Sequence, residues 1–247
     1  MATTADGQFP KTRWTLIHRL RDPDEQSSGR ALEEICAQYH YPLYCYIRRR
    51  GLDYHDAQDA LQEFFAKLLR LRTFGEADAA KGHLRAFLVT ALQRFLINWH
   101  RDRAHLRREM SADAPMPDAD SEERYRHEHF TEEDTPERIF DRRWSCELLE
   151  RVLQLVGEAY AARGRGAVFG ALRPALMAGG TLRGGDAPAL AASLGITENA
   201  LHATLSRLLR EYRAILEREV LQTVGSREEV ASEIACLLRA FQQAGPY

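Results

Sequence analysis

Apolar residues recur at steps of three and four between residues 82 and 108, in the sequence GHLRAFLVTALQRFLINWHRDRAHLRR. The members of this stripe are Leu84, Phe87, Leu88, Ala91, Leu92, Phe95, Leu96 and Trp99. Such a period predicts one long helix with a single buried face. After Trp99 the stripe stops, and residues 81–108 together hold seven Lys or Arg against one Asp. A helix that is apolar at one end and cationic at the other favours contact with phosphates, although cations near a helix C-terminus also suit the helix dipole.

Three further amphipathic stretches precede this helix. We expect a short helix from Thr12, a helix over residues 29–50, and a third helix that Asp53 caps and that runs to about residue 72. Pro42 lies inside the second helix and is expected to kink or divide it. No segment alternates with period two over the length of a strand, so the sequence predicts an all-α protein with a compact helical domain in this half.

The second half begins with residues 109–134, which are rich in Ser, Asp, Glu and Pro and predict an acidic linker. Thr135 and Pro136 open the next helix as a cap and a first-turn proline. Residues 186–216 predict a short helix, a turn and a longer helix, a pattern that fits a helix-turn-helix but also any helical hairpin. A last amphipathic helix begins at Ser226. Because its apolar face needs a partner, we expect it to brace a closed arrangement of two domains in the free protein.

Bulk composition narrows the range of functions. The chain has 247 residues and a formal net charge of −2, with no apolar run near the roughly 20 residues of a membrane span and no signal-peptide pattern, so we expect a cytoplasmic protein. The cysteines are scattered without a Cys-x-x-Cys pair, which predicts reduced thiols rather than zinc ligands or disulfides. Nine acids lie between Asp118 and Glu137, and they mask the basic stretch that precedes them.

No pattern typical of an enzyme is present. His55 and Asp56 form a dipeptide found in some metal-dependent hydrolases, but neither His40 nor His83 stands at a spacing that completes a metal site. The chain lacks both a glycine-rich phosphate loop and a Gly-x-Ser-x-Gly motif. We therefore expect a protein without catalytic residues, metal or cofactor.

The third helix carries an unusual row of carboxylates. Asp56, Asp59 and Glu63 are spaced i, i+3 and i+7, which places them on one face, and Lys67 compensates Glu63 in part. Acids near a helix N-terminus also suit its dipole, but that explanation does not reach as far along the helix as Glu63. A protein partner with a basic surface explains the row better.

These stretches resemble a known family. YPLYCYIRRRG, the acidic DAQDALQEFFAKLLR and the basic helix beginning HLRAFL are similar to domain 2 of bacterial sigma-70-family factors, and DAPALAASLGITENALHATLSRLLREY is similar to domain 4 of the extracytoplasmic-function (ECF) group. The N-terminal FPKTRWTL and the extra C-terminal helix resemble a subset of that group found in bacteria rich in Ser/Thr kinases. The likeness covers most of residues 9–240. It implies sigma domain 2 over 9–108, a linker over 109–134, sigma domain 4 over 135–224 and a helical extension over 225–247.

The resemblance also implies site residues. Contacts to the β′ clamp helices of core RNA polymerase would come from Asp56, Gln58, Asp59, Gln62, Glu63 and Phe64. The minus-ten promoter element would be read by Arg94, Asn98, Trp99, Arg101 and Arg103. The minus-thirty-five element would be read or held by Thr197, Asn199, Ala200, His202, Ala203, Thr204, Arg207, Arg210 and Arg213. Trp99 has a second interpretation as a core residue that ends the apolar stripe, whereas Leu201, Leu205 and Leu208 are expected in the core.

The chain departs from the family pattern at three of these positions. Gln58 replaces a usual carboxylate, which removes one charge from the polymerase-binding set. His202 and Thr204 replace common cations, which lowers the sequence-independent part of DNA affinity.

The resulting hypothesis is an ECF-type sigma factor that binds core RNA polymerase through the β′ clamp helices and the β flap, recognises promoter DNA and helps to melt it. An anti-sigma protein or a Ser/Thr kinase is a further expected partner by family analogy, although residues 53–72 offer no Ser or Thr to phosphorylate. The alternatives are a helix-turn-helix regulator that acts on duplex DNA without polymerase, and a protein whose domains bind only other proteins. The carboxylate row discriminates, because a repressor has no use for it.

Overall fold

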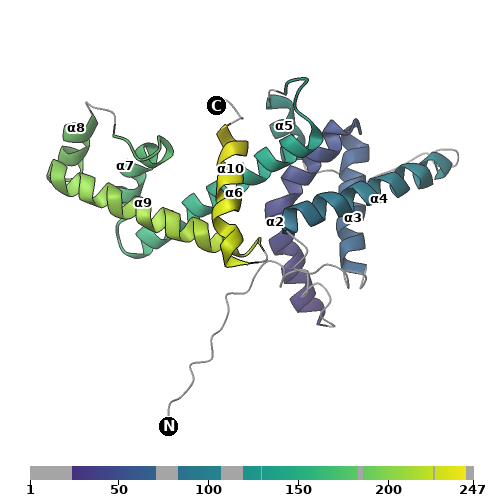
Figure 1. The fold of residues 1–247 in the computed structure, drawn as a ribbon, viewed down its shortest axis with the longest axis horizontal. Helices are drawn as coiled ribbons and strands as arrows, with labels where there is room; N and C mark the ends of the chain where they lie inside the picture. Colours follow the sequence, from purple (N-terminus) through teal and green to yellow (C-terminus); the bar gives the residue numbers. More distant parts are fainter. Residues whose placement is uncertain are drawn as a thin grey trace, which may run out of the picture. The chain divides into compact units, whose positions relative to one another are not determined.

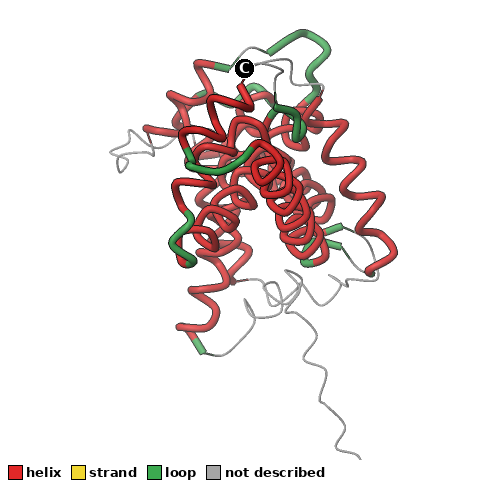
Figure 2. The backbone as a smooth tube through the Cα atoms, turned by 90° about the vertical axis from the view of Figure 1, so that its left-hand side faces the viewer, coloured by secondary structure: helices red, strands yellow, loops and turns green. Residues whose placement is uncertain are grey.

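The computed structural model describes residues 24–70, 83–106, 119–128, 130–182, 186–224 and 226–242. Within these ranges the chain forms nine α-helices and one short 3₁₀ turn, and no strand (Figures 1 and 2). The prediction of an all-α protein is confirmed for the described part of the chain. The helix expected from Thr12 lies outside the described residues.

The described residues divide into two compact units. One, called here the larger unit, draws on residues 1–146 and 221–247, and the other, the smaller unit, comprises residues 147–220. The larger unit is therefore built from two separate stretches of chain. The expected boundaries set residues 119–146 in a linker and a second domain and set the last helix in an extension, whereas the described residues of both stretches fall in the same unit as the first helices.

Helix α2 (Glu25–Arg49) forms the centre of the larger unit and packs on α3 (Tyr54–Arg70). It begins earlier than the expected residue 29 because the side chain of Asp24 accepts hydrogen bonds from the amides of Gln26 and Ser27 at 3.3 and 3.1 Å. Pro42 does not divide the helix. A proline inside a helix loses a hydrogen bond, and the buried residues around it, Tyr39, Leu43 and Tyr46 among them, offset that cost through packing.

The acidic segment that was expected to be a linker contains helix α5 (Ala119–His127), which lies against α2. Glu122 is buried and accepts hydrogen bonds from the Arg48 guanidinium at 3.1 and 3.2 Å and from the hydroxyl of Tyr44. Further along, Arg143 lies 2.7 Å from Glu128. These carboxylates neutralise arginines of α2 and of α6 (Pro136–Ala162), so the described part of the acidic segment is part of the larger unit.

Helix α4 (Leu84–Leu106) and the C-terminal helix α10 (Val230–Gln242) complete the larger unit. The core side of α4 is the predicted stripe, with Leu84, Leu88 and Leu92 fully buried. α10 is preceded by a 3₁₀ turn, Arg227–Glu229, and Ser226 makes no capping hydrogen bond with its side chain, so the expected capping box does not form.

The smaller unit contains the second part of α6 together with α7 (Gly166–Met177), α8 (Asp186–Ser193) and α9 (Glu198–Leu221). The chain turns from α6 into α7 at Gly164, whose φ of 68° is in the left-handed region that glycine adopts most readily. A Cβ atom at Gly157 would come within 2.9 Å of the ring of Phe169, so the glycine allows close packing of α7 on α6. Arg151 and Arg163 on α6 or just after it pair with Glu219 and Glu211 on α9.

Candidate functional site

Helix α3 presents polar residues on one face and packs the opposite face into the core. Asp53 caps it, since its carboxylate accepts a hydrogen bond from the Asp56 amide at 2.8 Å, as the sequence predicts. Gln62 and Glu63 are exposed, and Asp56, Gln58 and Asp59 are half-buried. The residues between them, Ala57, Ala60, Leu61 and Phe65, are buried. The carboxylate row of Asp56, Asp59 and Glu63 is therefore accessible at the surface of the larger unit.

Phe64 differs from the rest of the predicted polymerase-binding set. Its side chain is 2 % exposed, and its ring lies 5.9 Å from the ring of Phe65 and 5.6 Å from that of Phe95 on α4. In this conformation it contacts the core and not a partner. Its effect on the row is indirect, because the ring contact fixes α3 against α4.

Helix α4 exposes a second polar face. Arg94, Ile97, Asn98 and Arg101 are all exposed and follow one another at i, i+3, i+4 and i+7, so they share one side of the helix. We call these four residues the cationic face. The amide of Asn98 donates a hydrogen bond to the Arg94 carbonyl at 3.2 Å. Arg103 lies further along α4, and its side chain is outside the described part of the structure.

Trp99 belongs to the other side of α4. It is 6 % exposed and lies edge-on to the ring of His100, with 5.5 Å between centroids. The structure thus favours its interpretation as a core residue, because a base cannot stack on a ring that is already covered. The residue that sequence reasoning missed is Ile97, which is 67 % exposed between the two arginines. Its position one turn from Arg94 and Arg101, outside the apolar stripe, was the available signal.

In the smaller unit α8 and α9 are joined by a short turn in which Gly195 has a φ of 66°. Thr197 caps α9, accepting a hydrogen bond from the Ala200 amide at 3.2 Å. The exposed residues of the predicted set on or just before α9 are Thr197, Asn199, His202, Ala203, Arg207, Arg210 and Arg213, and Ala200 is half-buried. The turn thus delivers a row of polar and cationic side chains to one surface.

Thr204 is an exception within this set. It is 6 % exposed, and its hydroxyl donates to the Ala200 carbonyl at 2.7 Å, so in this conformation it is a core residue. Leu201, Leu205 and Leu208 are buried, which confirms their predicted place in the core. In the middle of the helix, the ion pair at 2.6 Å between Arg163 and Glu211 lowers the pKa of that carboxyl, so Glu211 stays ionised and keeps this pairing at neutral pH.

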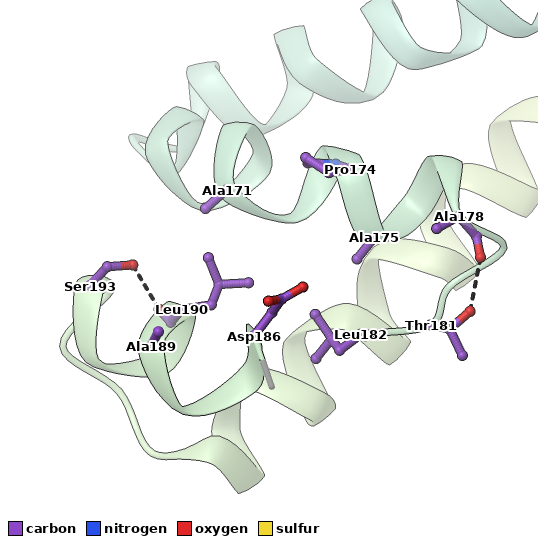
Figure 3. A pocket seen from close by; sticks show the side chains of 10 residues that line it. All are labelled: Ala171, Pro174, Ala175, Ala178, Thr181, Leu182, Asp186, Ala189, Leu190 and Ser193. Atoms are coloured by element: carbon purple, nitrogen blue, oxygen red, sulfur yellow. Dashed lines mark hydrogen bonds between the residues drawn. The ribbon is translucent and has the colours of Figure 1, made fainter. Parts of the chain in front are cut away.

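A groove of about 610 Å³ lies between α7 and α8 of the smaller unit. Figure 3 shows its lining, which is mostly apolar and small, with Ala171 and Pro174 on one side and Ala189 and Leu190 on the other. Among the lining residues that the structure describes, Asp186 alone is ionisable. The groove has the character of a surface for an apolar side chain or a short apolar helix rather than of a polar catalytic pocket.

Within the described residues no cluster of three or more His, Cys, Asp or Glu side chains gathers as a metal site. The four cysteines are free thiols, and burial raises the pKa of Cys36 to about 11, so this thiol is un-ionised at neutral pH. No helix in the described ranges is both long and apolar enough to cross a membrane. Compared with known proteins, the chain matches no family model, no curated protein and no solved structure.

Proposed function

We propose that this protein is a sigma factor of the ECF type, which binds core RNA polymerase, directs it to promoter DNA and helps to open the duplex. The observation that carries the proposal is that one compact unit has two polar faces at its surface: the carboxylate row on α3, with Glu63 exposed and Asp56 and Asp59 half-buried, and the exposed cationic face on α4. The helices that bear them are packed together through Phe64 and Phe95. In this proposal one of two packed helices offers carboxylates to a basic protein partner, and the other offers cations to phosphates.

Each face has a chemical role in this proposal. Carboxylates of α3 pair with basic residues of the β′ clamp helices. On α4, Arg94 and Arg101 hold the DNA backbone while Asn98 and Ile97 meet bases released from the stack, because unpaired bases expose polar edges and apolar faces together. The N-terminal part of α9 enters the major groove of the minus-thirty-five element, with Asn199 and His202 toward base edges.

In this proposal the β flap binds in the groove of the smaller unit. Its apolar, small-residue lining accepts an apolar helix face, and its position on α7 and α8 leaves the exposed side chains of α9 available to DNA. Ala189→Glu is expected to weaken polymerase binding through this groove. Ala214→Glu, at an exposed position of α9 outside the groove lining, is the matched control.

The deciding experiment is retention of purified core RNA polymerase by the immobilised chain. Wild type is expected to retain it, and Asp59→Ala/Glu63→Ala to lose at least ten times in affinity. Glu123→Ala/Glu132→Ala removes the same charge from exposed positions of the acidic segment and is expected to bind normally. Failure of the wild type to bind core enzyme would overturn the proposal.

Duplex binding separates the proposed function from a regulator that acts without polymerase. A sigma factor is expected to recognise promoter DNA much more tightly in complex with polymerase than alone. Tight, sequence-specific binding of free protein to duplex DNA, unaffected by Asp59→Ala/Glu63→Ala, would favour the regulator instead.

A further inference from the structure

The C-terminal helix α10 returns to the larger unit and meets the start of α4. Glu233 on α10 is 2 % exposed, and both of its carboxylate oxygens accept hydrogen bonds from Arg85, at 2.7 Å from Nε and 3.2 Å from Nη2. Nδ1 of His83 lies 3.2 Å from the same carboxylate. A partly buried two-point pairing between residues 148 positions apart fixes the register of the two helices against each other.

Arg85 joins a third helix to this contact. Its Nη1 donates to the carboxylate of Asp141 on α6, and its guanidinium carbon lies 5.4 Å from the centre of the Trp144 ring. α4, α6 and α10 thus converge on one guanidinium. Such a fork, with separate N–H groups directed at two carboxylates, holds all three helices in one orientation.

The chain just before α10 also provides a hydrogen-bond acceptor for the N-terminus of α4. The amide of Leu84, the first residue of α4, donates to the carbonyl of Thr223 at 3.1 Å. First-turn amides have no partner within their own helix, so this bond satisfies a donor that would otherwise be buried without one. Leu84, Thr223, Val224 and Leu237 are all buried, which excludes water from the contact.

From these contacts we infer that α10 is a positioning element for the DNA-reading helix, and that Glu233 acts through Arg85 as a positioning residue for promoter opening. This inference rests on the proposed function. The cationic face starts nine residues after Arg85, about 13 Å along the helix. Because α4 is one continuous helix, its orientation at Arg85 sets where Arg94 to Arg101 point.

The inference predicts a split between two activities. The carboxylate row lies on α3, whereas Glu233 bonds Arg85 in the first turn of α4 and lies beside His83 just before it, so polymerase binding is expected not to depend on the Arg85–Glu233 pair. Promoter opening is expected to depend on the Arg85–Glu233 pair, because opening requires α4 to orient its cationic face toward the DNA. A role limited to general stability would lower both activities together.

The test uses full-length Glu233→Gln, which keeps the shape of the side chain and removes its charge. In reconstituted holoenzyme, core retention is expected within twofold of wild type, and the rate of promoter opening, read by 2-aminopurine fluorescence in the minus-ten element, is expected to fall at least tenfold. Amide hydrogen exchange at residues 94–101 of the free protein is expected to quicken. Glu228→Gln, which removes a charge at an exposed position before α10, is the matched control and is expected to behave as wild type.

A second variant, Arg85→Lys, keeps the charge but lacks the planar fork that bonds both oxygens of Glu233, and it is expected to give the same split if Glu233→Gln folds poorly. Opening at the wild-type rate, or equal losses of core retention and opening in both variants, would overturn the inference. If wild type itself ignores core polymerase, the proposed function fails. Amide exchange in α4 then still tests whether α10 positions that helix, and unchanged exchange in Glu233→Gln would overturn the inference.

Discussion

Glu122 is the carboxylate through which the acidic segment is held on α2, and its ionisation makes the larger unit sensitive to acid. Burial alone would raise its pKa, but hydrogen bonds from Tyr44, Arg126 and Arg48 outweigh burial and lower the pKa below the ordinary 4.5. The folded chain therefore favours the charged form. The contribution of ionised Glu122 to the stability of the fold is complete at neutral pH. It begins to decrease near pH 4.5 and is lost as the pH falls through the lowered pKa.

Glu122→Gln is expected to lower the free energy of unfolding at pH 7 by about 1–3 kcal/mol, because charged hydrogen bonds are lost. The loss stays moderate since Arg48 keeps a bond of 2.7 Å to the Leu52 carbonyl. Urea unfolding is expected to show that the free energy of unfolding falls less between pH 7 and pH 3.5 in this variant than in wild type. The exposed neighbour Glu123→Gln is the control. An unchanged pH dependence in Glu122→Gln would contradict the role given to this carboxylate.

Ile97 contributes to DNA opening rather than to folding if the proposed function holds. Its exposure leaves little packing to lose, so Ile97→Ala is expected to change stability by less than about 0.5 kcal/mol. The rate of promoter opening is expected to fall about fivefold. Contact of one methylene with the bases is worth about 0.8 kcal/mol, or roughly fourfold in rate, and the truncation to alanine removes more than one methylene. Leu238→Ala, at another exposed apolar position, is the control.

Opening by Ile97→Ala at the wild-type rate, alongside a clear loss in Arg94→Ala, would remove Ile97 from the site and leave the arginine in it. A clear loss in Ile97→Ala with no loss in Arg94→Ala would indicate that this face acts as an apolar docking surface. Both measurements use the same fluorescent promoter, so they are directly comparable.

Phe64, Trp99 and Thr204 show where residue-level prediction reached its limit. Each occupies a position that the family likeness marks as functional, and each is buried here. Phe64 and Trp99 continue the apolar spacing of their own helices, so periodicity alone indicated the core. Thr204 carries a hydroxyl, and its bond to the carbonyl four residues earlier satisfies that group inside the helix, which no pattern of apolar residues reveals.

At the scale of single elements, helix type and helix starts were largely predictable because they depend on local chemistry. The caps of Asp53 and Thr197 form as expected. Helix α5 was not predicted as a docked element. Its composition is that of a solvated linker, and Glu122 is bonded by Tyr44 and Arg48 of α2, which are distant in sequence.

Where α4, α6 and α10 meet, substitution of Arg85 is expected to destabilise the fold more than substitution of Glu233. Arg85→Met leaves the carboxylates of Glu233 and Asp141 without their shared cation, whereas Glu233→Met leaves Arg85 still paired with Asp141. Arg85→Met is therefore expected to lose about 3–5 kcal/mol of unfolding free energy, and Glu233→Met clearly less. The double variant Arg85→Met/Glu233→Met is expected to be more stable than Arg85→Met alone. Equilibrium denaturation of the three variants measures these differences.

Equal losses in both single variants, with no recovery in the double variant, would mean that the pair contributes little beyond side-chain packing. Arg94→Met supplies a control for the substitution itself, because it removes a guanidinium from an exposed position of the same helix.

At the scale of the whole molecule, the path of the chain sets what can fold alone. The larger unit needs residues that precede and residues that follow the smaller unit in the sequence, since Glu233 of α10 pairs with Arg85 of α4, which also bonds Asp141 of α6. The sequence did predict that the last helix needs a partner. Which helix it meets was not predictable, because Arg85 and Glu233 carry no local pattern that links them across 148 positions.

A chain that ends at Leu221 tests this dependence. Deleting the residues after α9 removes Glu233, the carbonyl of Thr223 and the buried side chains of Val224 and Leu237 from the larger unit. The thermal transition of the larger unit is expected to fall by about 10 °C, given the roughly 3–5 kcal/mol of a broken buried pair. Residues 147–220 are contiguous and all remain after this deletion, so calorimetry is expected to show their transition within about 2 °C of its original temperature. A fall shared equally by both transitions would show instead that α10 supports the smaller unit as much as the larger one.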